Sequence, residues 1–148
     1  MRLQEGTILY FHLFHFKNSG TLPKSKYFIV IKHIGDTTLL ASLPSSQKHL
    51  PRHLQSTYGC LEIPDSGIGC YAFQSGVSVA TNNFAFPLDS YLFGQHLDEY
   101  NSLTINDMYP FEGINYDILG CLKIDTLVAV IDCFKNSASV KRRFRRLL

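Results

Sequence analysis

The chain has 148 residues, the usual length of one domain, and we expect a single domain over 1–148. Apolar residues make up 45% and charged residues 18%, which excludes a disordered chain, and no apolar run approaches the roughly 18 residues that span a bilayer. The net charge is +2, with five of the 14 basic residues among the last eight. The remaining nine face 12 acidic residues, a net −3, so the chain is not a uniformly basic nucleic-acid binder.

The segment at 7–16 is rich in β-branched and aromatic residues and apolar on both faces. This pattern predicts a strand buried on both sides, or one that curls within a barrel. After a loop with Gly20 and Pro23, residues 26–33 form a second strong strand pattern. A short turn at 34–36 leads to a third strand at 37–43, so these two strands should form a hairpin.

The middle of the chain has weaker patterns. Residues 44–57 form a polar loop with room for one helical turn. Short strands are expected at 58–63 and 70–74, with weaker ones near 78–80 and 91–96, and a short helix at 103–108.

The C-terminal part changes to a helical period. Apolar residues recur every three or four positions over 124–134, which predicts an amphipathic helix. Ser137 or Ser139 can cap a second helix. In that helix the apolar side chains share one face and dock on the body, and five cations occupy the rest. The apolar residues are Val140, Phe144, Leu147 and Leu148, and the cations are Lys141, Arg142, Arg143, Arg145 and Arg146.

The cysteines and histidines give no metal or cofactor site. Cys60, Cys70, Cys121 and Cys133 contain no C-x-x-C pair. No export signal is recognised, so we expect a cytoplasmic protein with free, mostly buried thiols. His49 and His53 have helical ligand spacing, but Pro51 lies between them and no glutamate accompanies them. We expect no cofactor, and His12 and His15 should be ordinary hydrogen-bonded histidines.

The richest polar cluster covers residues 45–53 and contains two hydroxyls, two cations and two imidazoles. Cleavage of RNA requires one group that takes the 2′-OH proton, one that protonates the leaving oxygen, and a cation near the phosphorane. A histidine such as His49 can perform either proton transfer. The alternative is a solvated loop that is polar because loops usually are.

Three segments of the chain resemble the bacterial MazF/PemK toxin family. They are a Gly-led apolar strand at 6–11, a basic residue entering an apolar strand at 24–31, and a strand that ends in a Ser-rich turn at 41–47. The strand and helix pattern at 118–134 resembles the closing elements of the family. The resemblance implies a mainly β (α+β) fold, a small antiparallel SH3-like or MazF-type barrel with C-terminal helices. The barrel core would cover about residues 6–122 and the helices about 124–148.

The resemblance also implies a function, a metal-independent endoribonuclease that leaves a 2′,3′-cyclic phosphate. Lys26 would hold the phosphate where the family usually has arginine, and Ser45 or Ser46 would supply a hydroxyl, with His49 beside them. The expected partners are single-stranded RNA or an acidic antitoxin-like protein, and the chain should form a homodimer. The nucleic-acid-binding residues would be Lys24, Lys48, Arg52, His53, Arg142, Arg143, Arg145 and Arg146. Because lysine lacks the two-pronged grip of arginine on phosphate, a non-catalytic module that binds protein or nucleic acid is the alternative.

Overall fold

The computed structural model describes residues 3–17, 20–44 and 56–148. Within these ranges the strands are β1 (Thr7–Phe14), β2 (Lys24–Ile34), β3 (Thr37–Ser42), β4 (Gly59–Ile63), β5 (Ile68–Phe73), β6 (Ser90–Phe93), β7 (Leu97–Asn101) and β8 (Tyr116–Cys121). The helices are α1 (Ser102–Met108), α2 (Ile124–Lys135) and α3 (Arg142–Arg145), with single 3₁₀ turns η2 (Pro64–Ser66) and η3 (Gly94–His96).

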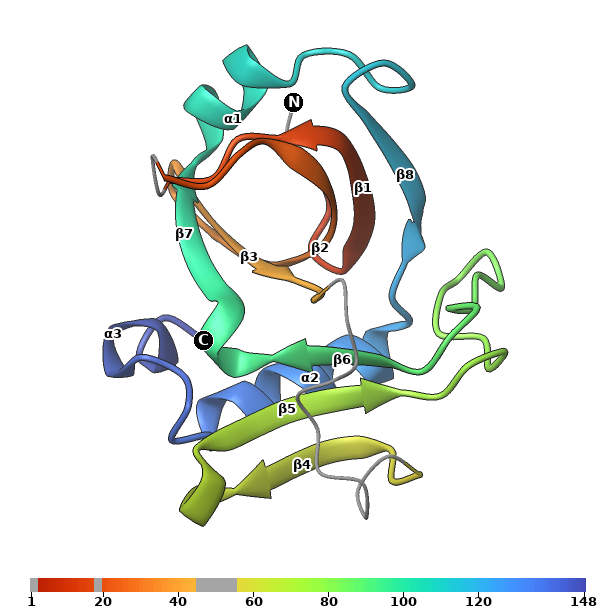
Figure 1. The fold of residues 1–148 in the computed structure, drawn as a ribbon, viewed down its shortest axis with the longest axis vertical. Coiled ribbons are helices and arrows are strands. Elements are labelled where there is room, and N and C mark those ends of the chain that lie inside the picture. Colours follow the sequence, from red (N-terminus) through yellow and green to blue (C-terminus); the bar gives the residue numbers. More distant parts are fainter. Residues whose placement is uncertain (1–2, 18–19, 45–55) are drawn as a thin grey trace.

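The strands form two antiparallel sheets, as Figure 1 shows. One sheet has the order β7-β3-β2-β1-β8 and curls strongly, and the other has the order β4-β5-β6. The predicted mainly β, α+β class is confirmed, as is the antiparallel hairpin of β2 and β3. The curled sheet is not a closed barrel, because β7 and β8 are its two edges.

Strand β1 lies between β2 and β8. Its first residues are buried on both faces, as the sequence predicts, whereas Leu13 near its end is 53% exposed. Ile8 faces the core that the two sheets share, whereas Leu9 and Phe11 face the concave side of the curled sheet. The pairing of β1 with β2 shifts register between Phe11 and Phe14. Such bulges increase local twist, which helps this sheet to curl.

The concave side of the curled sheet is filled by aromatic rings centred on Phe14, which is 1% exposed. Its ring centroid lies 4.5 Å from that of Phe28 and 5.0 Å from that of Phe11. Tyr109, just after α1, stacks on Phe14 at 5.4 Å, and Tyr100 of β7 meets it edge-on at 5.8 Å. This aromatic cluster therefore joins β1, β2, β7 and the end of α1.

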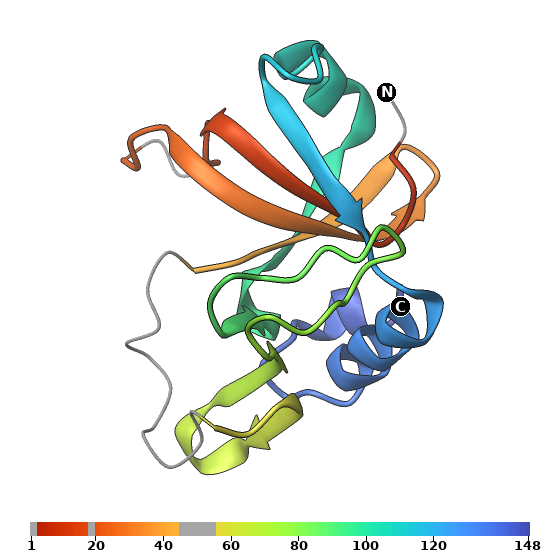
Figure 2. The same cartoon turned by 90° about the vertical axis from the view of Figure 1, so that its right-hand side faces the viewer.

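The second layer consists of the three-stranded sheet with α2 packed against β4 and β5 (Figures 1 and 2). Val130 and Phe134 of α2 are fully buried in the shared core. In the C-terminal segment Val140 and Phe144 are also buried, with Leu147 and Leu148 packed beside them, so the predicted apolar face does dock. The helix there begins only at Arg142 and has no side-chain cap, in place of the expected start at Ser137 or Ser139.

Several predicted boundaries need correction. Residues 91–96 divide into β6 and the turn η3, and the strand β7 that follows was not predicted. Residues 78–80 contribute only a single bridge, from Ala80 to Leu122. Gly94 allows this turn to pack closely on the C-terminal segment, because a Cβ there would lie 2.5 Å from the Val140 side chain. The helical turn considered within 44–57 falls mainly on residues outside the described ranges.

The expectation of four free thiols is wrong for two cysteines. Cys60 of β4 and Cys133 of α2 form a disulfide, with Cα atoms 5.5 Å apart. Cys70 and Cys121 remain free, and Cys70 is buried. Spacing in the sequence could not reveal this pair, because docking of α2 on β4 brings the two residues together. The cysteine content therefore gives no support for a reducing compartment.

In the described part of the chain, none of the helices combines the length and the apolar character that crossing a membrane requires.

Loss of the Phe14 ring, at the centre of the aromatic cluster, should destabilise the protein more than loss of an exposed side chain. We expect Phe14→Ala to lower the free energy of unfolding by about 3–5 kcal/mol, as large-to-small changes of buried phenylalanine do. Urea denaturation followed by circular dichroism measures this. Leu22→Ala, at a side chain that is 83% exposed, is the control and should change stability by less than about 0.5 kcal/mol. Equal effects of the two changes would contradict the role of the aromatic cluster.

The disulfide spans 73 residues of sequence, so its removal should destabilise the protein. We expect Cys60→Ser to lower the free energy of unfolding by about 2–4 kcal/mol, because the unfolded chain regains freedom. Reduction of the wild type should have the same effect, whereas Cys121→Ser should leave the response to reductant unchanged. Thiol titration in denaturant without reductant should find only Cys70 and Cys121 reactive. Four reactive thiols would contradict the pairing.

Candidate anion-binding site

A hollow of about 300 Å³ opens where β2 begins, next to η3 and β7. Three lysines and a histidine from three segments line it, and we call it the lysine pocket. Its polar lining includes Lys24, Lys26, Ser42, His96, Tyr100 and Lys141. Phe16 and Phe28 are part of its apolar lining, so the aromatic cluster adjoins the pocket.

The alternation of β2 accounts for two of the lysines. Side chains two residues apart share a face of a strand, so Lys24, Lys26 and Phe28 point to the same side. Phe28 is buried in the aromatic cluster, Lys26 is half-buried, and Lys24 is exposed at the start of the strand. The cations thus stand at the mouth of the curled sheet, with the rings behind them.

The other two basic residues come from distant parts of the chain. His96 ends the turn η3, and Lys141 directly precedes α3. The close approach of Gly94 to Val140 places the two segments side by side. The lysine pocket therefore depends on docking of the C-terminal segment against η3.

The electrostatics of the lysine pocket favour an anion. Partial burial, and next the charge of Lys24, lower the pKa of Lys26 from its ordinary value of 10.5. Asp98 is the carboxylate among the lining residues, and Lys17 already pairs with it at 3.3 Å. The cationic side chains therefore repel one another, and a bound anion would relieve that repulsion.

Two larger hollows adjoin the lysine pocket. One, of about 480 Å³, we call the aromatic pocket; it shares Phe16 and Tyr100 with the lysine pocket. The other, of about 580 Å³, we call the apolar cleft; it shares Lys26 and is lined by side chains such as Tyr10, Tyr27 and Phe86. The lysine pocket therefore has an apolar neighbour on each of two sides, with which it shares lining residues.

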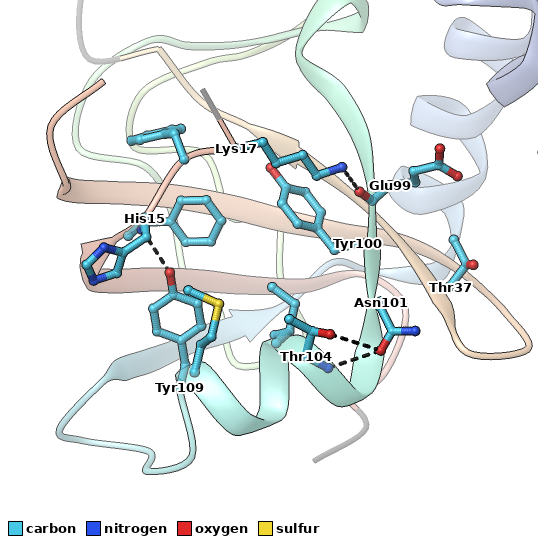
Figure 3. Close-up of a pocket in the computed structure, with 12 residues that line it drawn as sticks. His15, Lys17, Thr37, Glu99, Tyr100, Asn101, Thr104 and Tyr109 are labelled. Carbon is cyan, nitrogen blue, oxygen red and sulfur yellow. Dashed lines mark hydrogen bonds between the residues drawn. The ribbon is translucent and has the colours of Figure 1, made fainter. Parts of the chain in front are cut away.

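Figure 3 shows the aromatic pocket, where the Tyr100 ring points from β7 towards the end of β1. The Lys17 ammonium lies 4.4 Å from the centre of that ring and also donates to the Glu99 carbonyl oxygen. Burial, then the charge of Asp98, raise the pKa of Tyr100 far above its ordinary value, so its phenol stays protonated. On the other side, the His15 backbone N–H donates to the Tyr109 hydroxyl at 2.8 Å.

Of the site residues expected from the sequence, Lys24 and Lys26 lie together in the lysine pocket. Those from the polar loop lie outside the described residues: Ser45, Ser46, Lys48, His49, Arg52 and His53.

The arginines of the C-terminal segment divide into three groups. Arg142 and Arg146 are exposed, and Arg145 is half-buried. Arg143 donates to the Glu99 carboxylate at 2.8 Å and lies over the Phe144 ring at 4.6 Å. Exposed ion pairs of this kind contribute about 0.2–1 kcal/mol. Arg143 is thus engaged by the fold, while Arg142 and Arg146 face solvent.

Sequence reasoning missed Lys141, His96 and Ser42 as members of one site. The signal for Lys141 was its place in the basic run, but its nearness to Lys26 depends on the C-terminal segment docking. His96 carried no signal, because the strand β7 beside it was not predicted.

Elsewhere His12 hydrogen-bonds Asp117 at 2.8 Å, the ordinary role expected for it, whereas the His15 ring is exposed beside Tyr109. In the ranges that the structure describes, no three His, Cys, Asp or Glu side chains gather closely enough to hold a metal ion.

No protein-family model matches the sequence, and a search of curated proteins finds no significant match. The resemblance to the MazF/PemK family therefore stays a prediction from the residues that carry it.

The lowered pKa of Lys26 predicts a pH dependence of anion binding. A bound phosphate group would raise that pKa, so binding takes up a proton and affinity falls as pH rises through the pKa of the free protein. Because that pKa is below the ordinary value, the fall should begin at less alkaline pH than for an unperturbed lysine.

Lys26→Arg should move this fall to higher pH, because guanidinium keeps its charge. Titration of an alkali-stable 2′-O-methyl oligonucleotide from neutral to alkaline pH measures it, with exposed Lys123→Arg as the control. Superimposable pH profiles for the wild type and Lys26→Arg would exclude Lys26 as the titrating group.

Proposed function

We propose that this protein binds single-stranded RNA and that the lysine pocket holds a phosphate of the strand. The observation that carries the proposal is the convergence of Lys24, Lys26, Lys141 and His96 on one hollow. The carboxylate beside them is already paired with Lys17. Ammonium groups are common phosphate ligands, and phosphate contacts supply most of the sequence-independent affinity for nucleic acid.

A strand longer than one nucleotide would find further cations nearby. Lys141 is followed at once by Arg142, whose side chain is exposed, and Arg146 is exposed on the same short segment. The body of the chain without this segment is net negative. Because the excess of positive charge lies in the segment that begins at Lys141, and Lys141 lines the lysine pocket, a polyanion would be attracted to this part of the molecule.

The choice of RNA rests on the resemblance to the MazF/PemK family. Lys26 is the residue that the resemblance assigns to phosphate, and it lies in the lysine pocket. The finer expectations belong to the same proposal: a MazF-type barrel, a homodimer, a cytoplasmic location, and an acidic antitoxin-like protein as an alternative ligand for these cations. Such a protein would compete with RNA for the lysines.

Metal-independent cleavage of the bound RNA is the second candidate function, because Lys26 and His96, two groups able to transfer protons, line the same pocket. Partial burial lowers the pKa of Lys26, so its ammonium is a stronger acid than that of an exposed lysine. In this reaction the 2′-oxygen attacks phosphorus and the bond to the 5′-oxygen breaks. A base takes the 2′-OH proton, an acid protonates the leaving oxygen, and a 2′,3′-cyclic phosphate remains. Lys26 and His96 are the described candidates, beside the roles predicted for Ser45, Ser46 and His49.

Two double variants of equal charge test the binding site. Lys24→Gln with Lys26→Gln should weaken binding of a fluorescent single-stranded RNA and reduce the slope of log affinity against log salt. Each lost phosphate contact lowers that slope by about 0.7, so two should lower it by about 1.4. Fluorescence anisotropy at several salt concentrations measures both quantities.

Lys123→Gln with Lys135→Gln is the control, since both lysines are exposed at the ends of α2 and neither lines the lysine pocket. An equal loss in the two double variants would mean diffuse attraction in place of a site, and no binding by the wild type would overturn the proposal. The same RNA, incubated with a chelator, tests cleavage. A 2′,3′-cyclic end that disappears with Lys26→Ala would favour the enzyme, and uncut RNA would leave binding alone.

A further inference from the structure

The aromatic pocket directly adjoins the lysine pocket, with Phe16 and Tyr100 lining both. The nucleoside attached to a phosphate held among the lysines would therefore lie next to the aromatic pocket. Its lining is mainly apolar and includes Phe14, Ile105, Met108 and Tyr109. A volume of about 480 Å³ lies within the usual range for small-molecule sites.

The charges around the aromatic pocket are arranged so that a polyanion can enter. Glu99 of β7 lines this pocket and its neighbour Asp98 lines the lysine pocket, and each is paired with a cation from another segment. Lys17 pairs with Asp98 at 3.3 Å, and Arg143 pairs with Glu99 at 2.8 Å. A phosphate backbone passing these residues would meet carboxylates whose charge is offset by a neighbouring cation, which weakens the repulsion.

The polar groups at the rim suit the edge of a planar heterocycle. The side-chain amide oxygen of Asn101 (Oδ1) caps α1 by accepting from the backbone N–H groups of Leu103 and Thr104, both at 3.0 Å. Its amide NH₂ group has no partner among the described residues and can donate to a ligand. The exposed His15 ring, beside Tyr109, offers one more face or edge.

We propose that the aromatic pocket is a nucleobase subsite, which takes the base attached to the sugar whose phosphate lies in the lysine pocket. The proposal rests on the RNA-binding function, and it adds that bases contribute to affinity as well as phosphates. Stacking between bases and aromatic side chains accounts for much of the affinity of single-strand binders and is tolerant of sequence. A ligand that binds only through its charges would leave this pocket unused.

Two pentamers of equal charge distinguish the contribution of the bases to affinity from that of the phosphates. One contains five uridines, and the other contains five abasic ribose phosphates. The wild type should bind the uridine pentamer about 5-fold or more tightly than the abasic one, the ratio for one stacked base. His15→Ala with Met108→Ala removes two exposed side chains from the pocket wall without touching the lysines. This double variant should lose the preference and keep the affinity for the abasic pentamer.

Leu103→Ala is the control, because Leu103 is 63% exposed on the same helix as Met108 but does not line the aromatic pocket. It should keep the wild-type preference. Equal affinity of the wild type for the two pentamers, or an unchanged preference in the double variant, would overturn the base subsite while RNA binding stands. Failure of the wild type to bind either pentamer would overturn both proposals.

Discussion

Phe14 packs against the rings of Phe11, Phe16, Phe28, Tyr100 and Tyr109 on the concave side of the curled sheet. These residues come from β1 and the residues just after it, β2, β7 and the end of α1, which lie far apart in the sequence. The two edges of this sheet are not hydrogen-bonded to each other, so its backbone pairing does not lock the curl. Burial of the aromatic rings does so, because opening the sheet would return a large apolar area to water.

The same packing determines where charge can accumulate. Since rings fill the interior, the lysines on that face of β2 can lie only at its start, where the face reaches solvent. Phe16 and Tyr100 line both the lysine pocket and the aromatic pocket, so the two pockets adjoin. One group of side chains thus stabilises the fold and provides the apolar half of the candidate site.

The sequence predicted best those elements whose residues follow a local pattern of composition or periodicity. The β-branched strands at the N-terminus and the 3.6-residue period of α2 identify these elements with little help from the rest of the chain. β7 escaped prediction because Leu97-Asp98-Glu99-Tyr100-Asn101 is polar, and only its pairing with β3 makes it a strand. Lys24 and Lys26 could be named together from the sequence, because they lie two residues apart at the start of one strand. His96 and Lys141 join them only through long-range docking.

The pairing of β1 with β8 has a consequence for biosynthesis. Thr7 pairs with Cys121, so one edge of β1 stays without its partner until most of the chain has been made. The meander of β1, β2 and β3 contains only local connections and can form early. It would then present an apolar strand with open hydrogen-bonding groups, a surface on which strands of other molecules can add. Recovery of native protein should therefore depend on the rate of synthesis and on chaperones that shield this edge until β8 arrives.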